Sequence, residues 1–89
     1  PLTIEILAQR SKMSVRNFQR VFTRQCGMPA AKFVERLRTE RARVIIEDTT
    51  LSMAEVAHKS GFDDEQRMRH SFQRVLGINP ADHADRVRR

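Results

Sequence analysis

The 89-residue chain is long enough for one small folded unit or two very small ones, which leaves little room for a catalytic cleft. Its 17 Lys and Arg residues outnumber 11 Asp and Glu residues, and 14 of the 17 are arginines, so an anionic partner is favoured. The single cysteine excludes an internal disulfide, and no spacing of Cys or His residues suggests a zinc site. No apolar run is long enough to span a membrane. We therefore expect a protein that is not an enzyme and that binds no metal, cofactor or membrane.

The first predicted elements are a short helix over about residues 4–10, a tight turn, and a longer helix over residues 14–26. Thr3 can cap the short helix, with Leu2 packed against Leu7 as a hydrophobic staple. Gly27 follows the longer helix and suits the left-handed residue that ends many helices. A short helix, a tight turn and a longer helix in this order are typical of a helix-turn-helix unit.

Residues 14–26 divide into two faces when they are placed on a helical wheel. The apolar face, which we expect to pack inward, consists of Val15, Phe18, Val21, Phe22 and Cys26. The opposite face is polar and consists of Arg16, Gln19, Arg20, Thr23 and Arg24. Arginines spaced by four without an acidic neighbour repel one another instead of forming ion pairs, so this face favours a polyanionic partner over an ordinary solvated surface.

Residues 30–48 are predicted to form one long helix, which by its rise per residue spans about 28 Å and can join two small units. A fourth helix is predicted over about residues 53–59, where Ser52 and Glu55 form a capping box. After a turn at Gly61, a fifth helix covers residues 63–76 and ends at Gly77. Asn79 and Pro80 begin a sixth helix that reaches about Val87.

The fifth predicted helix also has two faces, but its polar face is less basic. The side chains expected to face inward are Met68, Phe72, Val75 and Leu76. The outward side chains are Gln66, Arg67, His70, Gln73 and Arg74, with Arg69 at the margin. The acidic first turn at residues 63–65 complements the helix dipole but repels phosphate, so we expect this helix to contribute less binding energy or to read fewer bases.

The two halves of the chain repeat each other. Residues 18–38 match residues 68–88 at a constant offset of 50, and upstream of them the offset is 49. Among the matches Ala8 pairs with Ala57, and Lys12 stands where the second copy has Gly61, although a left-handed lysine costs about 1 kcal/mol. Chance likeness between two amphipathic helices explains the matched caps, glycines and arginines less well than duplication does. We therefore predict an all-α fold of about seven helices, with residues 1–29 and 49–89 as helix-turn-helix units and residues 30–48 as the linker helix.

The most specific motifs are Gly61-Phe62, Phe72 and the sequence GINP at residues 77–80. With the duplicated units and the long helix, they resemble the DNA-binding domain of the AraC/XylS family of bacterial transcriptional regulators over nearly the whole chain. The resemblance implies a monomeric domain that places residues 14–26 and 63–76 in successive major-groove segments of double-stranded DNA, about 34 Å apart. It implies base contacts from Arg16, Gln19, Arg20, Gln66, Arg67, Arg69 and His70.

The same reading assigns the remaining polar residues of the two helices to the DNA backbone. We expect phosphate contacts from Ser14, Thr23, Arg24, Gln73 and Arg74. His70 stands where an arginine is common in the family, which weakens guanine reading by the second unit. We expect the chain to be a fragment of a bacterial, cytoplasmic and nucleoid-associated regulator, which also has an N-terminal effector or dimerisation domain and contacts RNA polymerase.

Two other classes of function stay open from the residues alone. One is a basic helical module that binds an acidic protein, and the other is an RNA-binding protein. All five phenylalanines are expected to face inward, and the chain has no Trp or Tyr, so stacking platforms for single-stranded RNA are disfavoured. Cys26 and His83 are expected in the core and His58 at the surface.

Overall fold

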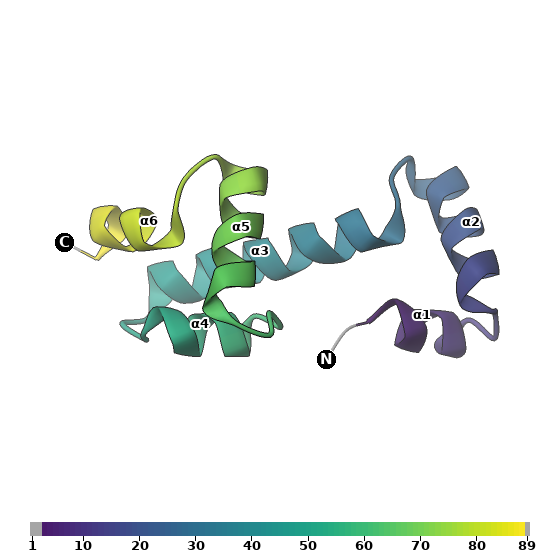
Figure 1. The fold of residues 1–89 in the computed structure, drawn as a ribbon, viewed down its shortest axis with the longest axis horizontal. Coiled ribbons are helices and arrows are strands. Elements are labelled where there is room, and N and C mark those ends of the chain that lie inside the picture. Colours follow the sequence, from purple (N-terminus) through teal and green to yellow (C-terminus); the bar gives the residue numbers. More distant parts are fainter. Residues whose placement is uncertain (1–2, 89) are drawn as a thin grey trace. The chain divides into compact units, whose positions relative to one another are not determined.

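The computed structural model describes residues 3–88, which contain six α-helices and no strand (Figure 1). The helices are α1 (Ile4–Arg10), α2 (Val15–Cys26), α3 (Ala30–Asp48), α4 (Met53–Lys59), α5 (Glu65–Leu76) and α6 (Pro80–Val87). The all-α class is thus confirmed, with six helices against the expected number of about seven. The expected staple at Leu2 lies outside the described residues.

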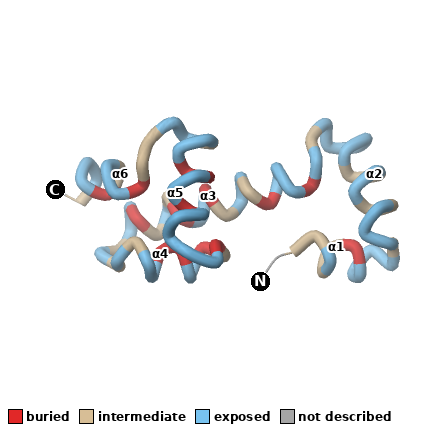
Figure 2. Tube along the Cα trace, in the orientation of Figure 1, coloured by how far each residue is buried: buried red, intermediate tan, exposed pale blue. Residues whose placement is uncertain are grey.

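The chain divides into two compact units, residues 1–35 and residues 36–89, and the boundary falls within α3. In the first unit α1 packs against α2, and the buried residues are Ala8, Ala30 and Val34. The ring of Phe22 lies 5.7 Å from that of Phe18 and 5.4 Å from that of Phe33 between centroids. α2 has no fully buried residue, so the first unit has a shallow interior (Figure 2).

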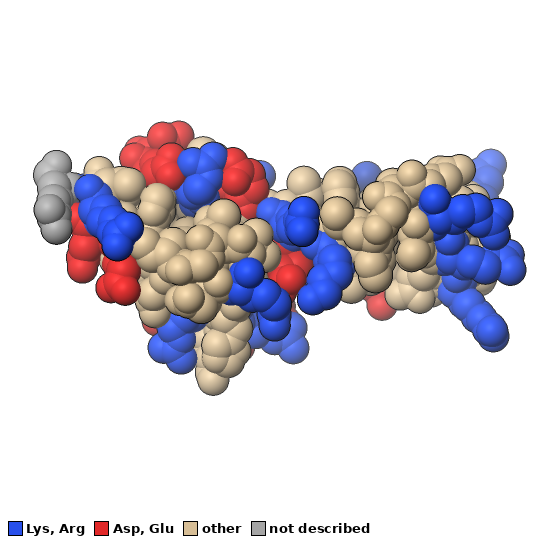
Figure 3. Space-filling view, turned by 90° about the horizontal axis from the view of Figure 1, so that it is seen from above, with Lys and Arg blue, Asp and Glu red and all other residues tan. Residues whose placement is uncertain are grey.

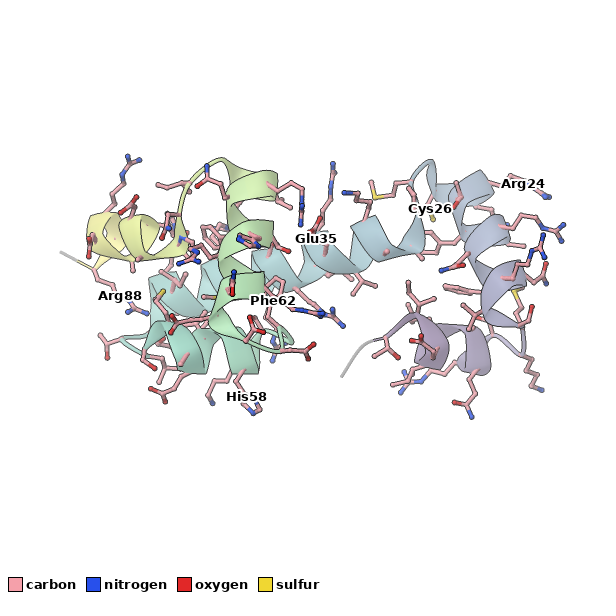
Figure 4. All side chains as sticks on the ribbon, in the orientation of Figure 1. Arg24, Cys26, Glu35, His58, Phe62 and Arg88 are labelled. Atoms are coloured by element: carbon pink, nitrogen blue, oxygen red, sulfur yellow. The ribbon has the colours of Figure 1, made fainter. Side chains whose placement is uncertain are left out.

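The second unit has a deeper core, in which α5 packs against both α4 and α6. The buried core residues are Ala42, Ile46, Val56, Ala57, Phe62, Met68, Phe72 and Ala84. Polar contacts connect α6 to α3 at the edge of this core. Nε of Arg88 donates to the carbonyl of Ile46 at 3.1 Å (Figure 4), and Nε2 of His83 lies 2.9 Å from Oε2 of Glu47. The imidazole of His83, and after it the guanidinium of Arg43, lower the pKa of Glu47.

Side-chain caps determine where most of the helices begin. Ser52 and Glu55 form the expected capping box, and Thr3 accepts the amide N–H of Ile6 at 3.1 Å. The predicted start of the fifth helix at residue 63 is wrong, because Asp64 is extended (φ −152°, ψ 169°) and its carboxylate accepts the N–H of Arg67 at 2.8 Å. α5 therefore begins at residue 65, and α2 begins at residue 15, immediately after its own cap.

The backbone forms the same turn in both units, as the repeat in the sequence predicts. Met13 N–H donates to the carbonyl of Ala8 at 3.0 Å, and Phe62 N–H donates to that of Ala57 at 2.9 Å. Lys12 and Gly61 occupy equivalent left-handed positions, with φ of 56° and 93°. Gly61 also lies against α3, since a Cβ there would be 3.4 Å from the Nε of Arg38.

Several apolar side chains expected inside are instead exposed. Cys26 is exposed, and the exposed fractions are 37% for Val15, 38% for Phe33 and 39% for Leu76. Cys26 and Leu76 are the last residues of their helices, and Val15 is the first of its helix. His58 is exposed as expected, and His83 is partly buried against the ring of Phe72.

Candidate nucleic-acid interface

α2 presents its polar face outward because its other face packs into the first unit. Phe18, Val21 and Phe22 are half-buried, and Gly27 ends the helix in the left-handed conformation with φ of 74°. The side chains that the wheel placed outward are all exposed: Arg16, Gln19, Arg20, Thr23 and Arg24. Arg24 extends away from α2 in Figure 4.

The hydrogen bonds along α2 leave different groups available to a ligand. Oγ of Ser14 accepts the N–H of Asn17 at 3.2 Å, which leaves the hydroxyl proton of Ser14 able to donate outward. Oγ1 of Thr23 donates to the carbonyl of Gln19 at 2.8 Å, so its proton is already used within the helix. Nη2 of Arg20 donates to Oδ1 of Asn17 at 2.8 Å. This bond orients the guanidinium without neutralising its charge.

The charge on this face is not compensated. Residues 14–27 contain three arginines and no acidic residue, and in the part of the chain that the structure describes neither Arg16 nor Arg24 has an ion-pair partner. Figure 3 shows lysine and arginine side chains gathered over the α2 end of the first unit. The N-terminus of α2 adds the positive end of the helix dipole. The face therefore attracts anions, and its exposed donors can bond to them.

α5 presents an equally exposed but electrically balanced face. The side chains that the wheel placed outward or at its margin are all exposed: Gln66, Arg67, Arg69, His70, Gln73 and Arg74. Glu65, in the first turn, is exposed as well. Residues 63–76 contain three arginines and three acidic residues, and acidic and basic side chains are interspersed on the second unit in Figure 3. Nη1 of Arg67 lies 2.9 Å from Oδ2 of Asp63.

Two contacts on this surface were not predicted from the sequence. Asn17 bonds Arg20 and Asp63 pairs with Arg67, so each holds an arginine from about one helical turn earlier. The spacings of three and four residues, which bring side chains together on a helix, are the signal that would have indicated both.

The chemistry available on both helices is hydrogen bonding to base edges and phosphates. An arginine fork matches guanine N7 and O6, a glutamine amide matches adenine N6 and N7, and either cationic or hydroxyl donors can hold a phosphate. Between residues 3 and 88 no group of His, Cys, Asp or Glu side chains is placed to hold a metal ion. Over the same span no helix combines the length and apolarity needed to cross a membrane.

Comparison with protein families and curated proteins places the chain among transcriptional regulators. A family model described as a helix-turn-helix domain matches residues 7–86. The HTH-type transcriptional regulator Rv1931c of Mycobacterium tuberculosis is 45% identical over 74 residues, which are 83% of this chain and 29% of that protein. The HTH-type transcriptional activator AarP of Providencia stuartii is 32% identical over 80 residues, 90% of this chain and 59% of that protein. The chain thus spans less than two thirds of these relatives.

Solved structures share the fold. The DNA-binding domain of the global transcriptional factor AdpA, solved in complex with a target DNA, has a TM-score of 0.90 and 32% identity, covering 99% of this chain and 79% of that chain. An AraC-type regulator from Chromobacterium violaceum has a TM-score of 0.83 and 23% identity over 97% of this chain and 77% of that chain, a likeness of fold. By its matched motifs, its duplicated architecture and these relatives, the chain belongs to the helix-turn-helix DNA-binding domains of the AraC/XylS family of transcriptional regulators.

Proposed function

We propose that this domain binds double-stranded DNA in a sequence-specific manner, with α2 and α5 entering successive major-groove segments. The observation that carries the proposal is that both helices pack through one face and leave a row of exposed hydrogen-bond donors on the other. The complex of AdpA with its target DNA supports the proposal, because that domain is 32% identical to this one and has the same fold.

We assign base contacts to exposed polar side chains in the first two turns of each helix. On α2 they are Arg16, Gln19 and Arg20, and on α5 they are Gln66, Arg67, Arg69 and His70. Arg20 is the best oriented of the first group, because its bond to Asn17 fixes one Nη and leaves the remaining N–H donors free to meet a guanine edge.

Phosphate contacts are assigned to the cap of α2 and to the later turns of both helices. The residues are Ser14, Thr23, Arg24, Gln73 and Arg74. Ser14 has a hydroxyl proton to donate, whereas Thr23 must first turn away from the carbonyl of Gln19. Arg24 brings an uncompensated charge and so is the strongest of these contacts on α2.

The two helices have unequal parts in the proposed complex. The arginines of α2 supply most of the electrostatic attraction, because no carboxylate lies within residues 14–27. The segment of α5 carries equal numbers of arginines and acidic residues, so it adds discrimination between sequences more than overall affinity.

The domain is proposed to act as a monomer within a longer regulator. The relatives extend well beyond the matched region, which accounts for 29% of one and 59% of another, and this supports an additional effector or dimerisation domain. We propose that the full-length protein also contacts RNA polymerase. An acidic protein as the ligand of α2 is the weaker alternative, because the matched relatives are transcriptional regulators.

Selection of bound duplexes from a random pool, followed by a salt titration on the selected sequence, tests the proposal. We expect an enriched motif with two half-sites about one helical turn apart. The logarithm of the binding constant should fall with the logarithm of the salt concentration by about 0.9 for each phosphate contact. A pool without any enriched motif, or binding to duplex that does not depend on salt, would contradict sequence-specific DNA binding.

A further inference from the structure

Asp63 is the acidic residue in contact with a proposed base-reading arginine. Its Oδ2 lies 2.9 Å from Nη1 of Arg67, four residues later. Asp63 is not the helix cap, since the neighbouring carboxylate of Asp64 accepts the N–H of Arg67. The Asp63 carboxylate is therefore committed to the guanidinium of Arg67 and not to the start of α5.

A proposed base-reading arginine of α2 has a contact of a different character. Arg20 is held by the neutral amide of Asn17, at 2.8 Å, so its full positive charge remains for a ligand. Arg67 is held by a carboxylate, which cancels its charge at long range but occupies one of its five N–H donors. The remaining donors can still meet the two acceptors of a guanine edge.

The ion pair contributes little to folding. The side chains of Arg67 and Asp63 are 68% and 78% exposed, and an exposed pair of this kind has a small effect on stability. The ion pair has a larger effect on the binding of a polyanion. The carboxylate beside the guanidinium repels phosphate oxygens, whereas base edges carry no net charge and are therefore favoured as partners of Arg67.

We propose that Asp63 is a positioning residue that determines specificity: it holds Arg67 away from the DNA backbone, so that Arg67 discriminates between bases and α5 adds little affinity for non-cognate duplex. This inference rests on the proposed DNA-binding function. It also gives the acidic turn before α5 a role in recognition beyond its favourable interaction with the helix dipole.

The test compares Asp63→Asn with Glu65→Gln in the full 89-residue chain. Both substitutions remove one negative charge from the start of α5, but only Asp63→Asn removes the partner of Arg67. Affinities for the selected duplex and for a scrambled duplex are measured over a salt series, with far-UV circular dichroism to verify folding. Asp63→Glu retains the carboxylate and serves as the conservative control.

We expect Asp63→Asn to tighten binding to the scrambled duplex by up to about fivefold and to steepen its salt dependence by about one phosphate contact, so that the ratio of selected to scrambled affinity falls. Glu65→Gln should change both affinities alike and keep the ratio, and Asp63→Glu should keep it as well. In an Arg67→Ala background, Asp63→Asn should leave the ratio unchanged.

The outcomes separate this inference from the function on which it rests. If the unmodified chain binds the selected duplex but Asp63→Asn and Glu65→Gln act alike, only the total charge matters and the role of Asp63 is overturned. A loss of specificity that persists without Arg67 overturns it too. If the unmodified chain prefers no duplex at all, the proposed function fails and this inference fails with it.

Discussion

Lys12→Gly is the substitution whose effect follows most directly from the backbone. Among residues 3–88, Lys12 is the one residue other than glycine with a positive φ, at 56°. The equivalent residue of the second unit is Gly61, at 93°. Because the left-handed conformation crowds the Cβ of an L residue, we expect Lys12→Gly to make the first unit more stable.

The size of the gain is the difference between two opposing contributions. Relief of the left-handed strain contributes about 1–2 kcal/mol. The larger backbone entropy of glycine in the unfolded chain offsets about 0.5–1 kcal/mol of this. With both contributions near the middle of their ranges, the free energy of unfolding should rise by about 0.5–1 kcal/mol. Lys12 is exposed and, within the described residues, has no side-chain hydrogen bond or ion pair to lose.

Thermal unfolding and native-state hydrogen exchange at the amides of α2 measure the effect. A gain of this size corresponds to a rise in Tm of about 2–8 °C. Lys32→Gly is the matched control, because Lys32 is an exposed lysine of the same unit in an ordinary helical conformation, where glycine should cost about 0.5–1 kcal/mol. If both substitutions lowered the stability alike, the left-handed backbone at Lys12 would store no strain, which would contradict the prediction.

Further predictions concern the DNA-facing arginines, the second core and pH. Arg20→Ala should relax discrimination at one base position by about 1–3 kcal/mol, whereas Arg24→Ala should weaken all duplexes evenly and reduce the salt slope by about 0.9. Binding to single-base variants over a salt series separates the two, and an even loss for Arg20→Ala would reassign it to phosphate. Phe72→Ala removes a side chain with 0% exposure and should lower the free energy of unfolding in urea by about 3–5 kcal/mol. A loss no larger than that of a surface substitution would show that the second core does not depend on this ring. His83 first, and a neighbouring arginine second, lower the pKa of Glu47, so its stabilising effect is present above the ordinary carboxyl pKa and is lost as the pH falls through the folded value. Glu47→Gln should flatten the acid side of the stability curve, and an unchanged curve would contradict this role.

Local signals in the sequence sufficed for most of the fold. The capping box at Ser52, the Asn79-Pro80 start and the glycines at 27 and 77 fix helix ends through interactions within a few residues, and all of them are present in the structure. The start of α5 could not be predicted from the sequence, because Asp63 and Asp64 are both able to cap a helix. Which of the two is the cap depends on the backbone angles. The exposure of Cys26 was not predicted, because a helical wheel gives the direction of a side chain and does not show whether another element covers the end of the helix.

The faces of the candidate interface could be predicted from the sequence, but the contacts within them could not. The outward faces of α2 and α5 follow from helical periodicity, and every residue assigned to them is exposed. The partners of individual arginines could not be predicted from the sequence. The spacing of residues along a helix permits several contacts, and the side-chain rotamers determine which of them forms. The bonds of Asn17 to Arg20 and of Asp63 to Arg67 were therefore not predicted.

The shallow interior of the first unit has a thermodynamic consequence for the complex. α2 has no fully buried residue and carries three arginines without an acidic neighbour, so mutual repulsion works against its compact state. A ligand that binds only the folded form stabilises that form by mass action, and phosphates would relieve the repulsion at the same time. Duplex DNA should therefore act as a scaffold for this unit, whose amides would gain more protection from exchange on binding than those of the well-packed second unit.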